Sequence, residues 1–176
     1  MSRYFVPDSW YFITVPTSGH RAIFEPADLR NILRDRLEQA FVKFHVEYPD
    51  YAIMADHYHL LSSFGNTVDI PDFMQWVNGG VSHLARKRVD IPLPIWDEYH
   101  VFAPMQEDLL DKVRGYVVGN PLKHGDVHDE KELRQWPYST YGKLVVREGE
   151  EYAKDVVASV MHLEEGEFLS SFSKPL

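Results

Sequence analysis

The spacing of apolar residues divides the chain into alternating strand and helix segments. The stretch Trp10–Ser18, "WYFITVPTS", is rich in aromatic and β-branched residues and ends near Pro and Gly, which predicts a strand. Tyr51–Met54 and His57–Phe64 read as two strand segments joined by an Ala-Asp pair. A proline-containing connection then leads to a short strand around Tyr99–Phe102. Four short strands are therefore expected.

Three segments between and after these strands have apolar residues at helical spacing. They are Pro26–Glu47, Ile70–Arg88 and a helix that begins at Met105. The third helix is expected to end near Asn120, because Pro121 follows. The last thirty residues read as a helix and a loose tail. The order of elements predicts an α+β fold, with an antiparallel sheet and helices packed on it.

Composition and charge narrow the class of protein. A chain of 176 residues with 44% hydrophobic content can bury the core of one domain, and it has no cysteine for disulfides or thiolate metal sites. No apolar run approaches a membrane span and the N-terminus lacks signal-peptide features, so we expect a cytoplasmic protein without a membrane partner. The net charge of −9 argues against non-specific nucleic-acid binding. However, Arg86, Lys87 and Arg88 form a local basic run, either a DNA contact or a solvated helix end.

Two histidines flank Tyr58 in the segment "YAIMADHYHLLSSF". His57 and His59 are two residues apart, so on a strand their side chains point to the same side. They could converge on a metal ion or a substrate, or they could be two solvated imidazoles with no functional role. Two ligands do not complete a metal site. A third ligand has to come from elsewhere in the chain.

The third predicted helix offers a further pair of polar residues. Tyr116 and Asn120 are four residues apart in "YVVGN", so a phenol and an amide share one helical face. The simpler interpretation is a tyrosine packed by its ring and an asparagine placed at a helix end before a proline. Both interpretations remain open at this point.

Four motifs together resemble one family. "MADHYHLL", "PIWDEY", "YVVGNPLKHG" and "WPYSTY", in this order and at these separations, are similar to the single-tyrosine HUH transposases, where HUH denotes histidine, hydrophobic residue, histidine. The similarity is greatest to the REP-associated tyrosine transposases and extends from about Trp10 to Tyr141. It implies a ferredoxin-like sheet with the HUH strand at its centre. We expect residues 1–145 to form this domain and residues 146–176 a C-terminal helical extension.

The resemblance also implies a chemistry for individual residues. His57 and His59 match the catalytic metal-binding histidines, Tyr116 matches the catalytic nucleophile, and Asn120 matches the polar residue that completes the metal site. The implied cofactor is Mg²⁺ or Mn²⁺. The implied reaction is nicking and rejoining of single-stranded, hairpin-bearing DNA through a 5′-phosphotyrosine, with Arg86, Lys87 and Arg88 as DNA contacts. Family members include dimers, so a homodimer is left open.

The chain departs from the family pattern in its charges. Asp97 and Glu98 follow Trp96 where the family tends to place a polar or basic pair, and the second predicted helix is nearly uncharged before Arg86. A second class of function is therefore a nucleic-acid-binding regulator that keeps the fold without the activity. A third is a metal protein unrelated to nucleic acid, for which His124 and His128 form a rival i, i+4 pair.

Overall fold

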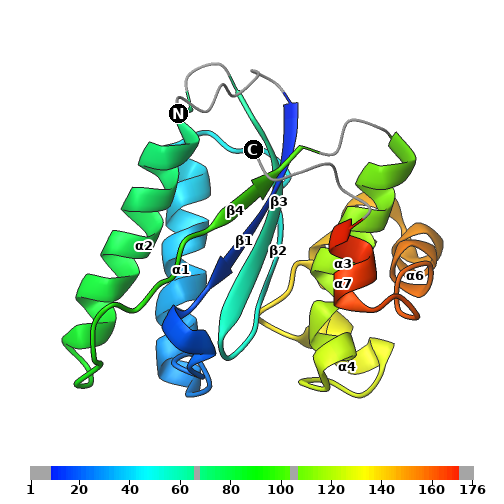
Figure 1. The fold of residues 1–176 in the computed structure, drawn as a ribbon. Coiled ribbons are helices and arrows are strands. Elements are labelled where there is room, and N and C mark those ends of the chain that lie inside the picture. Colours follow the sequence, from blue (N-terminus) through cyan, green and yellow to red (C-terminus); the bar gives the residue numbers. More distant parts are fainter. Residues whose placement is uncertain (1–8, 66–67, 104–106, 171–176) are drawn as a thin grey trace.

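The computed structural model describes residues 9–65, 68–103 and 107–170, and its centre is a four-stranded antiparallel sheet (Figure 1). The strands lie in the order β2-β3-β1-β4, with bounds β1 (Ser9–Pro16), β2 (Asp50–Ile53), β3 (His57–Phe64) and β4 (His100–Phe102). All three strand pairings are antiparallel. This order, with one helix after β1 and one after β3, is the ferredoxin-like arrangement. The predicted α+β fold is confirmed, and β3 is an interior strand.

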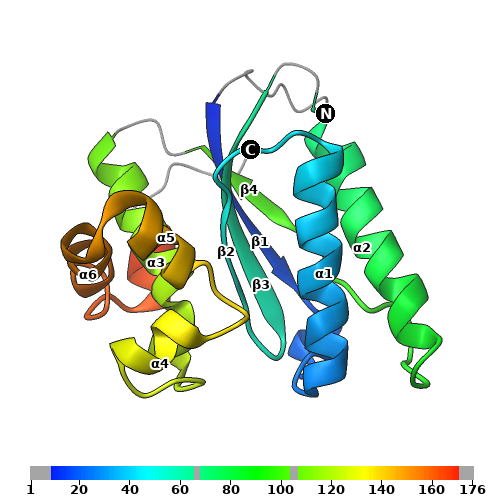
Figure 2. The same ribbon diagram turned by 180° about the vertical axis from the view of Figure 1, so that it is seen from behind.

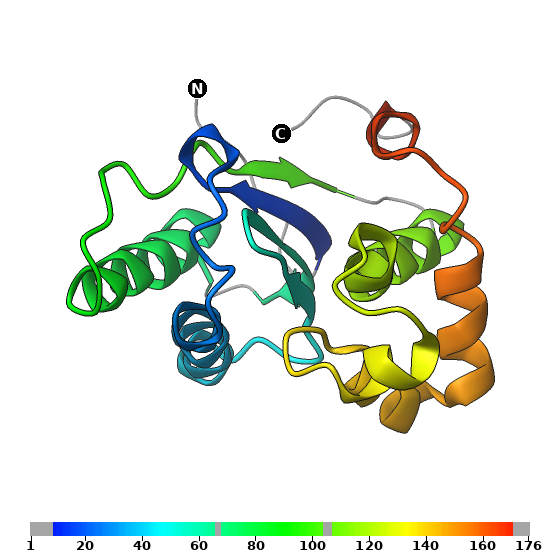
Figure 3. The same ribbon diagram turned by 90° about the horizontal axis from the view of Figure 1, so that it is seen from below.

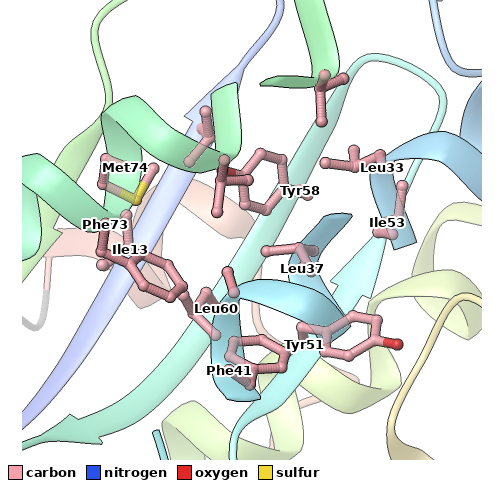
Figure 4. Close-up of a cluster of buried hydrophobic side chains, with 14 of the residues drawn as sticks. Ile13, Leu33, Leu37, Phe41, Tyr51, Ile53, Tyr58, Leu60, Phe73 and Met74 are labelled. Carbon is pink, nitrogen blue, oxygen red and sulfur yellow. The ribbon is translucent and has the colours of Figure 1, made fainter. Parts of the chain in front are cut away.

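Helices α1 (Ala27–Lys43) and α2 (Ile70–Arg86) cover one face of the sheet (Figures 1 and 3). Successive strand residues point to opposite faces, so Ile13, Tyr58 and Leu60 face this helical layer. They are fully buried there with Leu37 of α1 and Phe73 of α2, as the close-up in Figure 4 shows. The apolar stripe predicted for each helix is thus the surface that packs on the sheet.

The opposite face carries the remaining helices (Figures 2 and 3). Phe12 of β1 and Leu61 of β3 point to this side and pack against Val113 and Val117 of α3. The helices on this side are α3 (Glu107–His124), α4 (Glu130–Gln135), α5 (Tyr141–Glu148), α6 (Glu150–Ala158) and α7 (Glu165–Ser170). The two histidines of β3 belong to this second face, because they alternate with Tyr58 and Leu60.

The Trp-Pro-aromatic-Ser motif closes the edge of the sheet beside β2. The backbone N–H of Ile53 donates to the carbonyl of Tyr138 over 2.8 Å, and Ala52 pairs with Ser139 in an isolated bridge. The Tyr138 hydroxyl also donates to Asn31 Oδ1 on α1 over 2.9 Å. A covered edge cannot pair with a strand of another chain. This motif therefore stabilises the fold on the side where β2 would otherwise be open.

The predicted end of the third helix near Asn120 is wrong. Helix α3 continues through Pro121 to His124. Proline removes one helical hydrogen bond and disturbs the preceding turn. Here the Ser139 hydroxyl donates to the carbonyl of Val118 over 2.8 Å, and Val118 is fully buried. The carbonyl that loses its helical partner to Pro121 is that of Val117, so this bond does not replace the missing one. Tertiary packing of the fully buried Val117 and Val118 therefore holds this part of the helix in place.

The C-terminal part is more helical than its sequence pattern predicts. Residues 147–170 contain α6 and α7 rather than a single helix, and residues 171–176 of the expected tail lie outside the described residues. Helix α4 was not predicted; it is only six residues long, and Asp129 caps it by accepting from the N–H of Glu132 over 2.8 Å. Short helices give too few periodic positions to detect. The division into residues 1–145 and 146–176 stays a prediction.

Candidate active site

Strand β3 holds two imidazoles side by side on the sheet face that α3 covers. The ring centroids of His57 and His59 are 4.8 Å apart. His59 lies opposite Thr14 of β1, is only 2% exposed, and packs against the ring of Phe12 with centroids 5.5 Å apart. The strand geometry predicted from the i, i+2 spacing therefore brings the two histidines together.

A carboxylate orients the first imidazole. Nδ1 of His57 lies 2.6 Å from Asp56 Oδ1, which favours the tautomer with the proton on Nδ1. Nε2 of His57 is then the nitrogen with a free lone pair. It is buried and has no hydrogen-bond partner among the residues that the structure describes. Asp56 is itself fixed, because its carbonyl accepts from the N–H and the hydroxyl of Thr17 over 2.8 Å and 2.9 Å.

The second imidazole is held in its neutral form. Burial, followed by the proximity of His57 and then of His124, lowers the pKa of His59 well below its ordinary value. Neither ring nitrogen of His59 has a hydrogen-bond partner within the described part of the chain. Leaving a buried polar atom without a partner costs about 1–3 kcal/mol, so such atoms are rare in folded proteins. The unpartnered ring nitrogens of His57 and His59 lie close together, which indicates that they bind a group other than the described residues.

Helix α3 brings the predicted tyrosine against this pair. The ring centroid of Tyr116 is 5.3 Å from that of His59. Tyr116 is 2% exposed, stacks on Phe168 of α7 at 4.1 Å and 15°, and meets Phe12 edge-on at 6.1 Å. One turn further, Asn120 is fully buried; its amide nitrogen donates to the carbonyl of Tyr116 over 3.3 Å. Its Oδ1 has no partner among the described residues, so an amide acceptor is unused beside the phenol.

A buried ion pair and a glycine fix α3 on its neighbours. Arg114 donates to Asp50 Oδ2 of β2 over 2.9 Å and to the hydroxyl of Tyr152 of α6 over 2.8 Å. Gly115 faces α6 so closely that a Cβ there would lie 1.8 Å from the carbonyl oxygen of Val156. Any side chain at position 115 would therefore push α3 and α6 apart. The residue before the tyrosine sets how closely these two helices approach.

The structure adds a residue that the sequence reasoning did not place at this site. The ring centroid of His124 is 5.3 Å from that of His57. His124 was paired with His128 as a rival i, i+4 pair, but Gly125, with φ of 79°, ends the helix between them. The signal that could have found it is its position four residues after Asn120, on the same helical face.

A cavity of about 310 Å³ opens beside the histidines. Its walls come from β1, β3, β4 and the ends of η1 (Ser18–His20) and α3, and they consist of Thr14, Val15, Pro16, His20, Asp56, His57, His59, His100 and His124. A larger hollow of about 610 Å³ lies between α1 and α5, but its lining includes none of the predicted site residues. We place the chemistry at the smaller cavity, because His57 and His59, whose buried ring nitrogens have no partner among the described residues, line it. Tyr116 and Asn120 are not among its lining residues; they lie behind the histidines on α3.

The donor set there fits a divalent cation. The candidate ligand atoms are Nε2 of His57, a ring nitrogen of His59 and Oδ1 of Asn120, and all of them are buried without partners in the described segments. Within those same segments, no three His, Asp or Glu side chains are arranged to hold a metal ion. A site of two imidazoles and one amide does not need such a trio. Imidazole nitrogen suits late first-row transition metals, and carbonyl oxygen suits Mg²⁺ and Mn²⁺, so this mixed set can hold either kind of ion.

Comparison with known protein families decides the identity. The model of the family described as "Transposase IS200 like" matches residues 6–120, which is more than half of the chain. The chain belongs to the IS200-like transposase family. The matched segment contains both histidines of β3, Tyr116 and Asn120.

Two solved structures are similar to this IS200-like transposase. A REP-associated tyrosine transposase bound to a REP hairpin is 19% identical, with a TM-score of 0.69 over 87% of this chain and 88% of the other. A transposase-like protein from Deinococcus radiodurans R1 is 23% identical, with a TM-score of 0.46 over 66% of this chain and 93% of the other. No curated protein sequence matches the chain. The first likeness supports the α+β fold.

The predicted DNA contacts of the IS200-like transposase lie at the end of α2. Arg86, Lys87 and Arg88 are all exposed. The C-terminal end of α2 and the turn between β2 and β3 lie at the same end of the molecule (Figure 1). The basic run and the histidines that begin β3 therefore share one end of the fold. In the part of the chain that the structure describes, no helix has the length and apolarity needed to cross a membrane.

Proposed function

We propose that this chain is a metal-dependent enzyme that nicks and rejoins single-stranded, hairpin-bearing DNA through a 5′-phosphotyrosine on Tyr116. The observation that carries the proposal is the contact between the rings of Tyr116 and His59, 5.3 Å apart, beside three buried donor groups without partners. A phenol next to a cation site suits phosphodiester cleavage by a tyrosine, because the phenol supplies the nucleophile and the cation can offset the charge on the phosphoryl group.

Each residue of the proposed site has a distinct role. His57, His59 and Asn120 would hold a Mg²⁺ or Mn²⁺ ion. When bound, that ion would polarise a phosphoryl oxygen and offset the charge that develops on it. Asp56 orients His57 by accepting from its Nδ1–H over 2.6 Å, so that Nε2 faces the ion. The burial of His59 keeps its imidazole neutral and able to act as a ligand.

Tyr116 performs the bond exchange. Its hydroxyl oxygen loses a proton and forms a bond to the phosphorus atom, while the bond from phosphorus to the 3′ oxygen breaks and that oxygen takes up a proton. The products are a tyrosine-bound 5′ end and a free 3′-hydroxyl. Rejoining reverses this exchange, with a 3′-hydroxyl as the attacking group. Because Tyr116 is only 2% exposed, the side chains that cover it have to move before a phosphodiester reaches its hydroxyl.

The DNA partner is inferred from charge and from the related structure. The REP-associated transposase was solved with a REP hairpin. We extend a hairpin substrate to this chain, with Arg86, Lys87 and Arg88 as phosphate contacts. The net charge of −9 disfavours attraction to random DNA, so recognition of a structured single strand at one end of the fold is the interpretation that fits.

The test is formation of a covalent protein–DNA adduct. The full-length chain is incubated with labelled single-stranded hairpin oligonucleotides and Mn²⁺, and adducts are separated under denaturing conditions. Wild type should form an adduct whose nucleotide maps to Tyr116 by mass spectrometry. Tyr116→Phe, which deletes only the oxygen, should form none while its circular dichroism and metal binding stay unchanged. Tyr138→Phe is the matched control, because that hydroxyl donates to Asn31 and serves the fold.

A nucleic-acid-binding regulator is the second candidate function, and the acidic net charge of −9 favours it. The two candidates differ in a measurable way. Hairpin binding without any adduct in wild type, under conditions in which Mn²⁺ is bound, would support the regulator and exclude the nicking reaction. An adduct that persists in Tyr116→Phe would refute the assignment of the nucleophile alone.

A further inference from the structure

A third imidazole, that of His124, lines the same cavity as His57 and His59. His124 is the last residue of α3, four residues after Asn120 and eight after Tyr116, so the three share one helical face. Its ring centroid is 5.3 Å from that of His57, which is in turn 4.8 Å from that of His59. The side chain is exposed and contributes to the wall of the cavity.

We propose that His124 is an additional ligand of the cation held by His57 and His59, and that it makes the site select a transition metal such as Co²⁺ or Zn²⁺ over Mg²⁺. This inference rests on the proposed metal site and extends it to the identity of the ion.

The spacing of the rings supports a shared ion. Consider two imidazoles that bind one ion through nitrogens about 2.1 Å from it. Their ring centroids are about 4.6 Å apart when the nitrogen–metal–nitrogen angle is a right angle, and about 5.3 Å apart when that angle is tetrahedral. The two separations in this structure, 4.8 Å and 5.3 Å, fall within that range. The ring of His57 therefore lies within the range for sharing an ion with each of the other two imidazoles.

One adjustment is needed for His124 to bind. Among the described residues, no three His, Asp or Glu side chains point their donor atoms at one position. The ring of His124 therefore has to turn, whereas His57 is oriented by Asp56 and His59 is buried. His124 is exposed at the end of α3, and rotation about its side-chain torsions changes the direction of its ring nitrogens.

The type of ligand determines which ion benefits. Mg²⁺ prefers six oxygen ligands in octahedral geometry and retains several waters. Imidazole suits Zn²⁺ and other late first-row ions, whose affinity for nitrogen ligands follows the Irving–Williams order. Two imidazoles and one amide form a mixed set that accepts either kind of ion. A third imidazole makes nitrogen the majority donor and favours the transition metal.

The chain contains a matched control for this ligand. His128 has the same side chain, is also exposed, and lies four residues further along the chain. It follows the turn at Gly125, and its backbone N–H donates to Glu132 over 2.8 Å. Replacing it removes an imidazole of similar exposure from the same region without touching the cavity wall.

The experiment measures metal binding directly. Co²⁺ and Mg²⁺ are titrated by calorimetry into the chelator-treated full chain as wild type, His124→Ala, His128→Ala and His57→Ala, and the visible absorption of bound Co²⁺ reports its nitrogen ligands. Since loss of an outer-shell partner alone costs about 10- to 100-fold in metal affinity, loss of a direct ligand should weaken Co²⁺ binding at least about tenfold. Mg²⁺ affinity should change less than about twofold in His124→Ala, because Mg²⁺ gains little from the imidazole.

The outcomes separate this inference from the proposed site. Weaker Co²⁺ binding and an altered absorption spectrum in His124→Ala, with His128→Ala like wild type, would support the third imidazole. Equal Co²⁺ affinity in His124→Ala and His128→Ala, with binding lost in His57→Ala, would overturn the inference and leave the proposed site intact. Co²⁺ binding that survives His57→Ala would overturn both. Thermal unfolding followed by circular dichroism verifies that each variant is folded.

Discussion

Arg114 on α3 donates a hydrogen bond of 2.9 Å to Asp50 on β2, and both side chains lie inside the protein. Arg147 of α5 reaches the same carboxylate from another direction, with 3.3 Å between Nη2 and each oxygen. The pair connects the helix of the proposed nucleophile to the edge strand of the sheet. The ion pair therefore stabilises the fold and also fixes the position of α3 relative to the sheet.

Replacing Arg114 by Met should destabilise the fold strongly. The substitution keeps an unbranched chain of similar length but leaves Asp50 buried with one cationic partner fewer. Removal of one member of a buried ion pair costs about 3–5 kcal/mol, and the remaining Arg147 should reduce this to about 2–3 kcal/mol. Urea denaturation measures the change in the free energy of unfolding.

The control for this prediction is Arg134→Met. Arg134 pairs with Glu150 over 3.7 Å with both side chains about half exposed, and solvent screens such exposed pairs so that they contribute little to stability. If Arg114→Met costs no more than Arg134→Met, the buried pair does not hold α3 in the way described.

Asp56→Asn should weaken metal binding without changing the fold. The variant loses the charge that orients His57 through its Nδ1, whereas the carbonyl of Asp56 still accepts from Thr17. Loss of such an outer-shell partner lowers metal affinity by about 10- to 100-fold. Calorimetric titration with Mn²⁺ measures it. Asp97→Asn is the control, because Asp97 is exposed, accepts from the N–H of Gly19 in η1 over 3.1 Å and is not among the residues that line the cavity. Equal affinities in the two variants would contradict a positioning role for Asp56.

Metal-free protein should lose stability as the pH falls below about 6.5. Burial, then His57 and His124, lowers the pKa of His59, so between its folded and unfolded pKa values the unfolded chain binds more protons. The free energy of unfolding therefore rises with pH in that window, and the stabilising contribution of the neutral His59 is lost as the pH falls through it. When the pH is lowered from 7.5 to 5.5, His59 should account for a decrease of about 1 kcal/mol in the free energy of unfolding.

Urea denaturation of wild type and His59→Asn in the presence of a chelator tests this difference. The loss between the two pH values should be smaller in His59→Asn than in wild type, whereas His128→Asn should follow wild type. A loss of the same size in wild type and His59→Asn would show that another group causes the pH dependence.

The basic run at the end of α2 should contribute a shallow salt dependence to DNA binding. Three phosphate contacts to a single strand give a slope of roughly −2 in a plot of log affinity against log salt. The triple Ala variant of Arg86, Lys87 and Arg88 should weaken hairpin binding and remove that slope. As a control, Lys131, Arg134 and Lys154 supply three exposed cations from α4 and α6. Fluorescence anisotropy at several salt concentrations makes the comparison. Identical slopes in the two triple variants would exclude α2 as the contact.

Much of the fold follows from local pattern. Strand alternation around Tyr58 correctly separates His57 and His59 from the side chains that pack under α1 and α2. The end of α3 could not be predicted, because the helix around Pro121 is packed against residues far along the chain, among them Ser139, which bonds the carbonyl of Val118. Local patterns do not contain such long-range contacts.

The same limit applies to the candidate site. The spacing of Tyr116 and Asn120 shows that they share a helical face, but not that this face meets β3. His124 was considered only with its sequence neighbour His128, since its closeness to His57 depends on the helix continuing past Pro121. The burial of Tyr116 under Phe168 depends on α7, a six-residue helix that the sequence pattern does not reveal.

The close approach at Gly115 has a mechanical consequence. The backbones of α3 and α6 are in contact at Gly115, and Arg114 donates to the hydroxyl of Tyr152 over 2.8 Å. We therefore expect the two helices to move together. A displacement of α3 that carries Tyr116 toward a DNA strand would have to carry α6 with it. Small adjustments of the phenol are therefore confined to its own side-chain torsions, whereas larger ones need the helical layer on this face to swing as a unit against the sheet.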